Sequence, residues 1–156
     1  MKNGFTVLEF LIYIVILAIA LAGMILASSN IFQVGTITEV YQEVSHNGSF
    51  AVHKIGQSVK EASGISIKEG GKVLELSFKD KNPTVFDVFD GKLRIKDGNS
   101  DYVDLTTNKV RVESLLFDKI SDYSVRVEMH VSFSNPQNLP QYDFKSYFTS
   151  SFTLKN

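Results

Sequence analysis

The segment from Phe10 to Ala27 contains only apolar side chains, apart from Tyr13 and Gly23. A helix rises about 1.5 Å per residue, so this run spans roughly 27 Å, close to the thickness of the hydrocarbon core of a bilayer. No Asp, Glu, Lys or Arg occurs between Glu9 and Glu39, whereas the residues after Glu39 mix polar and apolar side chains. The sequence therefore predicts one membrane-length helix followed by one water-compatible domain.

The composition of the 156 residues removes several classes of function. Cysteine is absent, which excludes disulfides, thiolate metal sites, iron–sulfur clusters and a cysteine nucleophile. Sixteen basic and seventeen acidic residues nearly balance and no basic run occurs, so we expect no nucleic-acid partner for this chain alone. No phosphate-binding loop, dinucleotide fingerprint, G-x-S-x-G or H-E-x-x-H motif is present. We therefore expect a protein that is not an enzyme and that needs no cofactor.

Glu9 constrains the role of the apolar segment. An N-terminal apolar run fits a cleaved secretory signal, a plain membrane anchor or the stem of an assembling subunit. A secretory signal begins with a basic region, and here Lys2 is its only basic side chain. Ala20 and Ala22 are small residues that would suit a cleavage site. Placing an unpaired carboxylate at the start of a membrane-embedded apolar segment costs free energy on the order of 3 kcal/mol. This cost counts against both a secretory signal and a plain anchor. In the third interpretation, the stem of an assembling subunit, Glu9 has a partner.

The stretch Lys2-Asn3-Gly4-Phe5-Thr6-Val7-Leu8-Glu9 resembles the N-terminus of type IV prepilins and type II secretion pseudopilins. The resemblance implies that a prepilin peptidase removes residues 1–4 as a leader by cutting between Gly4 and Phe5. It also implies N-methylation of Phe5, the new N-terminal residue, and an assembly role for Glu9. Other pilins or pseudopilins are then the partners, through the N-terminal helix.

A physical argument supports the role of Glu9. After cleavage, Phe5 would carry a cationic amine at the membrane surface, one helical turn before the Glu9 carboxylate. If neighbouring stems pack side by side with an axial shift, the amine of one pairs with Glu9 of the next, strongly where water is scarce. Glu9 would then set the register of assembly. The alternative is a glutamate that faces lipid headgroups.

The helix is expected to continue beyond the membrane as an amphipathic segment. Apolar residues recur at three- and four-residue steps, the period of a helix with one buried face: Val40, Val44, Ala51 or Val52, Ile55, Val59 and Ala62. Gly35 and the pair Asn47-Gly48 are expected to bend or fray the helix, and Gly64 to end it. The predicted division is a membrane and assembly half, 5–34, an amphipathic half, 35–63, and a β domain, 64–156.

The residues after Gly64 alternate between apolar and polar side chains, as in antiparallel strands with one buried face. The clearest run is Val125 to Phe133, with further runs around Leu74, Leu93, Val110 and Phe148. Turn signals separate these runs: Gly70-Gly71, Asn82-Pro83, Asp90-Gly91, Asp97-Gly98 and Asn135-Pro136. The amphipathic helix is the available cover, so we predict an α+β fold with one long N-terminal helix on an antiparallel sheet.

Residues 50–156 also resemble minor pilins and pseudopilins of the J or W type, through the Ile55–Ser63 helix, the following hairpins and the Ser151–Asn156 ending. The resemblance implies a pilin-like fold and a structural minor subunit of a type IV pilus or pseudopilus-like filament. It places the chain in the cytoplasmic (inner) membrane as a single-pass protein in contact with lipid, its N-terminus cytoplasmic and its β domain outside, before it enters the filament.

Two alternatives stay open at this point. The chain can instead be a bitopic, membrane-anchored β-domain binding protein that never polymerises. The second alternative is a calcium site in the acidic stretch Asp97, Asn99, Asp101 and Asp104, because carboxylate and amide oxygens are calcium ligands. The same residue types are common in the turns of β-hairpins. The stretch also lacks the bidentate Glu of an EF-hand.

Overall fold

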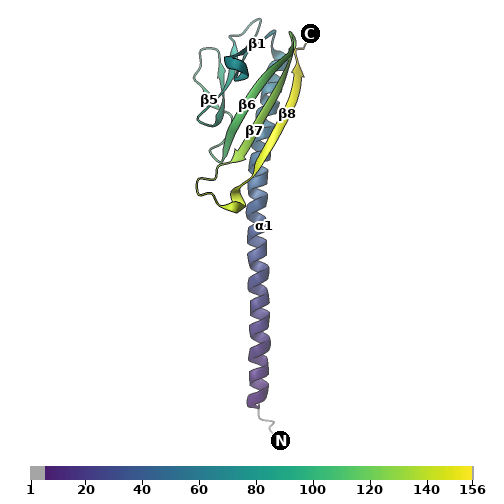
Figure 1. Cartoon of the computed structure of the whole chain (residues 1–156), viewed down its shortest axis with the longest axis vertical. Coiled ribbons are helices and arrows are strands. Elements are labelled where there is room, and N and C mark those ends of the chain that lie inside the picture. The colour runs from purple at the N-terminus through teal and green to yellow at the C-terminus, as the bar shows by residue number, and fades with distance from the viewer. Residues whose placement is uncertain (1–5, 156) are drawn as a thin grey trace. The chain divides into compact units, whose positions relative to one another are not determined.

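The computed structural model describes residues 6–155. The chain forms two compact units, one ending at Thr38 and one beginning at Glu39. Helix α1, Val7–Glu61, contributes to both units. In the first unit it is the only regular element among the described residues (Figure 1). The second unit holds the remainder of α1 and every β-strand.

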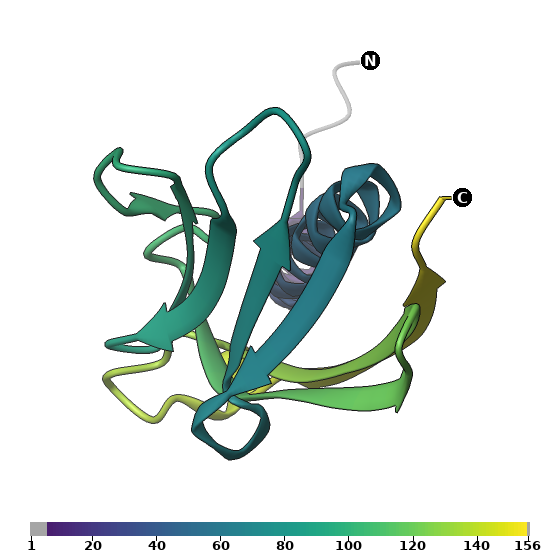
Figure 2. The ribbon, with the colours of Figure 1, turned by 90° about the horizontal axis from the view of Figure 1, so that it is seen from above.

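The second unit has an α+β fold, as predicted, but with two antiparallel sheets where the sequence predicted one (Figure 2). The first sheet has its strands in chain order: β1 (Gly64–Lys68), β2 (Val73–Ser77), β3 (Thr84–Phe89), β4 (Lys92–Asp97) and β5 (Val103–Asp104). The second sheet contains β6 (Val110–Ser121), β7 (Ser124–Phe133) and β8 (Lys145–Thr153). Two short 3₁₀ turns, η1 (Glu69–Gly71) and η2 (Pro140–Tyr142), lie in the connections.

The break between the sheets falls at residues 105–109. Strand β5 is only two residues long, and the chain then turns toward α1, where the Thr107 amide donates to Asn47 Oδ1 at 2.9 Å. The next strand, β6, begins at Val110 and pairs only with β7 in its sheet. The alternation of apolar and polar residues does not specify which strands pair with each other. The sequence therefore could not predict that the strands divide into two sheets.

The amphipathic half of α1 supplies the helical side of the core. Its buried apolar residues, with Ala62 directly after the helix, are those that the helical period predicted: Val40, Val44, Ala51, Ile55, Val59 and Ala62. From Val44 onward they form one core cluster with residues of both sheets: Leu74, Leu76, Phe86 and Leu93 from the first and Val125, Val127, Met129 and Val131 from the second. Burying each valine or isoleucine of this stripe contributes about 1.5–3 kcal/mol, so the stripe is a substantial stabilising contact of the unit.

The predicted hairpin at Asp90-Gly91 is confirmed. Phe89 and Lys92 face each other across the two-residue connection between β3 and β4. Asp90 and Gly91 both have positive φ angles, 50° and 73°, as the type I′ turn requires. Glycine tolerates this conformation and aspartate is among the few other residues that adopt it readily.

Helix α1 continues without interruption through Asn47 and Gly48, where the sequence analysis expected bending or fraying. The glycines of this segment make room for aromatic rings. A Cβ atom at Gly48 would lie 2.2 Å from the ring of Phe148, and one at Gly56 would lie 2.3 Å from the ring of Phe152. The order of these contacts shows that β8 runs alongside α1 in the same direction. Ring packing compensates for the low helix propensity of glycine.

The Gly48→Ala substitution is expected to lower the free energy of unfolding by about 1–3 kcal/mol, because the new methyl group displaces the ring of Phe148. The measurement is denaturant unfolding of the full chain in detergent, followed by circular dichroism. Gly35→Ala is the matched control, because nothing lies within 4 Å of a Cβ at Gly35. Equal stabilities of the two variants would contradict the role assigned to Gly48.

Candidate functional site

The N-terminal motif lies at the start of α1. The hydroxyl Oγ1 of Thr6 accepts a hydrogen bond from the backbone amide of Glu9 at 3.3 Å, and the carbonyl of Thr6 accepts from the amide of Phe10 at 3.2 Å. Thr6 therefore caps the helix, satisfying an amide that has no partner within the helix. Gly4 and Phe5, the predicted cleavage and methylation residues, lie outside the described residues.

Glu9 is exposed on the first turn of α1, and no ion pair in residues 6–155 includes it. Negative charge in this first turn interacts favourably with the helix dipole. The position is thus compatible with a local capping role and with an intermolecular one. The Glu9 carboxylate is available to a group from another chain.

The part of α1 that follows is long and apolar enough to cross a membrane over Val7–Ser28. Its large apolar side chains are all exposed within the chain, among them Leu8, Phe10 and Ile19. A soluble surface rarely presents so large a continuous apolar area, so this segment needs lipid or another protein around it.

The acidic stretch Asp97–Asp104 is divided between different partners. Asp97 Oδ1 accepts a hydrogen bond from Thr84 Oγ1 at 2.7 Å, and Asp104 Oδ2 lies 2.8 Å from Lys92 Nζ. Asn99 and Asp101 are exposed. Among the described residues, no group of three or more histidine or acidic side chains is arranged to hold a metal ion. Calcium binding here stays a prediction that no such cluster supports.

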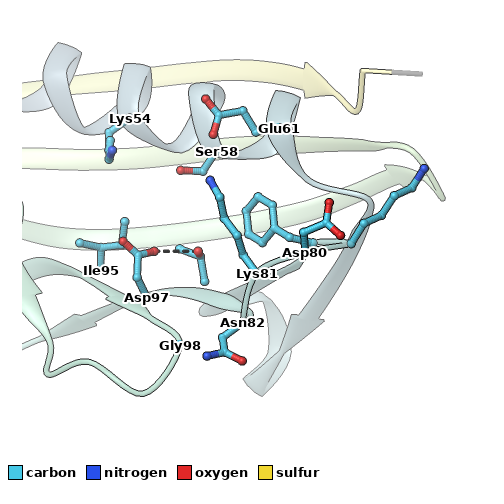
Figure 3. Close-up of a pocket in the computed structure, with 12 residues that line it drawn as sticks. Lys54, Ser58, Glu61, Asp80, Lys81, Asn82, Ile95, Asp97 and Gly98 are labelled. Atoms are coloured by element: carbon cyan, nitrogen blue, oxygen red, sulfur yellow. Dashed lines mark hydrogen bonds between the residues drawn. The ribbon is translucent and has the colours of Figure 1, made fainter.

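A cavity of about 770 Å³ lies between the last turns of α1, the β2–β3 connection and the end of β4 (Figure 3). Its charged side chains carry both signs: Lys54, Lys79 and Lys81 against Glu61, Asp80 and Asp97. The Asp97 carboxylate is already bound by Thr84, as the dashed line in Figure 3 marks. Because positive and negative side chains balance in this cavity, it favours neither an anionic nor a cationic ligand.

A polar cluster around the buried Asn47 connects α1 to the loop before β6. Asn47 is only 3% exposed; its Nδ2 donates to the backbone carbonyl of Glu43 at 2.9 Å and to Glu43 Oε1 at 3.1 Å. Thr107 completes the cluster, its amide donating to Asn47 Oδ1 and its hydroxyl to Glu43 Oε1 at 3.1 Å. Lys109 Nζ lies 3.3 Å from Glu39 Oε1 and 3.4 Å from Glu43 Oε2.

The cluster changes the acidity of its members. Burial raises the pKa of Glu43, but the hydrogen bonds from Thr107 and Asn47 and the charge of Lys109 outweigh it, so this pKa lies below its ordinary value of 4.5. Hydrogen bonding to Glu39, together with the charge of Glu43, raises the pKa of Lys109. Both groups are therefore charged at neutral pH, and the cluster fixes the 105–109 loop to the helix.

The sequence analysis missed this cluster. It considered only the low helix propensity of Asn47. The partner, Thr107, is distant in the sequence, so the contact could not be recognised there. The available signal was its phase: an amide three residues after Val44 and four before Ala51 falls beside the apolar stripe. A polar residue in that position needs a hydrogen-bonding partner from another element.

Comparisons with models of known protein families, with curated proteins and with solved structures gave no match. The fold and the N-terminal segment define the class without them. The described residues form an α+β protein with one N-terminal apolar helix that could span a membrane.

The Glu43 carboxylate should make the second unit sensitive to acid. Because its pKa is lowered in the folded protein, its stabilisation is present above the unfolded value of about 4.5 and is lost as the pH falls through the folded value. Glu43→Gln should therefore flatten the fall in unfolding free energy below about pH 4.5. The measurement is denaturant unfolding of the full chain across that range.

Lys109→Met provides an intermediate case. It removes one source of the lowered pKa and keeps the hydrogen bonds from Asn47 and Thr107. Its acid sensitivity should fall between those of the wild type and Glu43→Gln. An unchanged pH profile in Glu43→Gln would show that other groups carry the acid sensitivity.

Proposed function

We propose that this protein is a structural, minor-type subunit of a type IV pilus or pseudopilus-like filament. Its precursor is cleaved after Gly4, methylated on the amine of Phe5, and assembled through the apolar part of α1. The observation that carries the proposal is the order Gly4-Phe5-Thr6-Val7-Leu8-Glu9 directly before an uncharged, membrane-length segment. A glycine, an aromatic residue and a carboxylate at fixed spacing form a more specific signal than an apolar run alone.

The described structure supports this proposal in two respects. Helix α1 begins directly after Thr6, so Glu9 lies in its first turn, close to the N-terminus that cleavage would create. The apolar side chains of Val7–Ser28 are exposed, so they are available to lipid before assembly and to other stems afterwards. The same surface can thus serve a membrane-held precursor and an assembled subunit.

Glu9 is the proposed assembly contact. In a filament of staggered helices, the methylated amine of one subunit lies against the Glu9 carboxylate of its neighbour. An ion pair surrounded by apolar side chains is poorly screened, so breaking it by removing one partner typically costs about 3–5 kcal/mol. This contact would favour one axial stagger over the others.

The proposed topology follows from the same segment. Lys2 is the only charge before Glu9, and basic residues favour the cytoplasmic side of a membrane. The N-terminus therefore faces the cytoplasm, where the peptidase and the methyl donor have access to it, and the unit from Glu39 onward lies outside. The precursor resides in the inner membrane, and the mature chain moves from there into the filament.

The first test is the mass of the native N-terminus. The proposal predicts a mature chain that begins with N-methylated Phe5, and Gly4→Val should leave the unprocessed precursor, because a branched side chain obstructs the peptidase cleft. Asn3→Val is the control, one residue further from the bond, and should still be cleaved. An intact Met1 in the wild type would favour the plain-anchor alternative instead.

The second test separates assembly from anchoring. Glu9→Val and Glu9→Gln should both be inserted in the membrane and cleaved, but their crosslinking to neighbouring stems should fall at least about tenfold, since the neighbour's amine loses its partner. Glu39→Gln, at the other end of the uncharged run, should crosslink like the wild type. Undiminished assembly of the Glu9 variants would remove Glu9 as the register contact.

A further inference from the structure

The cavity of about 770 Å³ beside the last turns of α1 contains a largely buried hydroxyl that has no partner (Figure 3). Ser58 is only 9% exposed, and its hydroxyl makes no hydrogen bond with any described residue. No completely buried polar side-chain atom in residues 6–155 lacks a partner, so this hydroxyl is reached from the cavity. We propose that the cavity binds a small zwitterion of peptide type, about the length of a dipeptide.

The charged side chains of the cavity are not paired with one another. Three are cationic and three are anionic, and none of them belongs to an ion pair within residues 6–155: Lys54, Lys79, Lys81, Glu61, Asp80 and Asp97. Elsewhere in the same unit opposite charges do meet, as Arg94 and Asp87 do at 2.7 Å. The cavity therefore keeps both signs apart across a space that a ligand can fill.

A ligand with a single charge fits this lining poorly. An anion such as phosphate would meet the carboxylates as well as the ammonium groups. A metal ion would meet the ammonium groups, and no cluster of three or more histidine or acidic side chains among the described residues is arranged to hold one. Electrostatic complementarity therefore calls for both signs on one molecule.

Helix α1 presents its groups to the cavity in a fixed order. Lys54, Ser58 and Glu61 follow one another at steps of four and three residues, so they lie along one face of the helix. An ammonium group, a hydroxyl and a carboxylate are thus spread over a rise of about 10 Å. A dipeptide spans at most about 7 Å, and a hydrogen bond adds about 3 Å. The ligand carboxylate therefore faces Lys54 and Ser58, and its ammonium group faces Glu61.

The opposite wall supplies groups for the middle of the ligand. Figure 3 shows Lys81 extending from the β2–β3 connection toward Ser58, and the Lys81 ammonium group lies 5.7 Å from the centroid of the Phe78 ring. The side-chain amide of Asn82 can both donate to a peptide bond and accept from it. Phe78 and Ile95 add apolar surface for small side chains.

The test uses the full chain in a non-ionic detergent and three forms of one peptide. The free dipeptide L-alanyl-L-alanine carries both charges, its N-acetyl form lacks the cation, and its C-terminal amide lacks the anion. Binding, followed by isothermal titration calorimetry, should be saturable for the free dipeptide. Each single-charge form should bind at least about tenfold more weakly, because it loses a hydrogen bond to a charged group.

Substitutions locate the site. Ser58→Ala removes the unpartnered hydroxyl and should weaken binding of the free dipeptide about three- to tenfold. Glu61→Gln should weaken the free dipeptide and the amide form but not the N-acetyl form, which has no ammonium group. Lys54→Met should weaken the free dipeptide and the N-acetyl form but not the amide form. Lys60→Met is the matched control, because Lys60 is exposed beside Glu61 and does not line the cavity.

The three peptide forms are compared on the unaltered chain, so that comparison stands even if a variant misfolds. Absence of saturable binding, or equal binding of the three forms, would overturn the proposal. Unchanged binding by both Ser58→Ala and Glu61→Gln would place the peptide elsewhere and overturn it as well. None of these results depends on cleavage at Gly4 or on a contact of Glu9, so they are distinct from the tests of filament assembly.

Discussion

The apolar stripe of α1 from Val40 to Ala62 is the contact on which both sheets depend. Each sheet has one apolar face, and an antiparallel sheet of three strands is stable only when that face is covered. The buried valines and isoleucine of α1 meet Leu74 and Phe86 from one sheet and Val127 and Met129 from the other. The helix therefore holds together two sheets that share no strand. Without it, two apolar faces would be left in water.

Apolar burial alone would allow the helix to slide or rotate between the sheets, because it is not directional. Two directional features define its position. Gly48 and Gly56 receive the rings of Phe148 and Phe152, and Asn47 binds the amide of Thr107. A shift of one residue would push Cβ atoms into the rings and leave a buried amide unpaired. Polar and steric contacts thus select one arrangement from those that the apolar stripe would permit.

The sequence was sufficient for the elements and insufficient for their long-range partners. Helical and strand periods predicted the burial of Val44, Ile55, Val125 and Val131, because each period follows directly from backbone geometry. The division into two sheets was missed because alternation does not specify which strands pair. The ring pockets at Gly48 and Gly56 were missed because glycine carries only a local meaning in a sequence. The motif at Gly4 and Phe5 concerns processing and lies outside the described residues, so its meaning still depends on the sequence alone.

The pairing of α1 with β8 also imposes an order on synthesis. Gly48 and Phe148 are separated by about a hundred residues, and strands β1 to β7 lie between them. The ring pockets of the helix therefore stay empty until the last strand has left the ribosome, and closing so long a loop is slow. During this interval the apolar stripe from Val40 onward is exposed, while the segment before it is already apolar enough to enter a membrane. A chain of this design has a period of vulnerability to aggregation and proteolysis in every round of translation, and its C-terminal residues end that period.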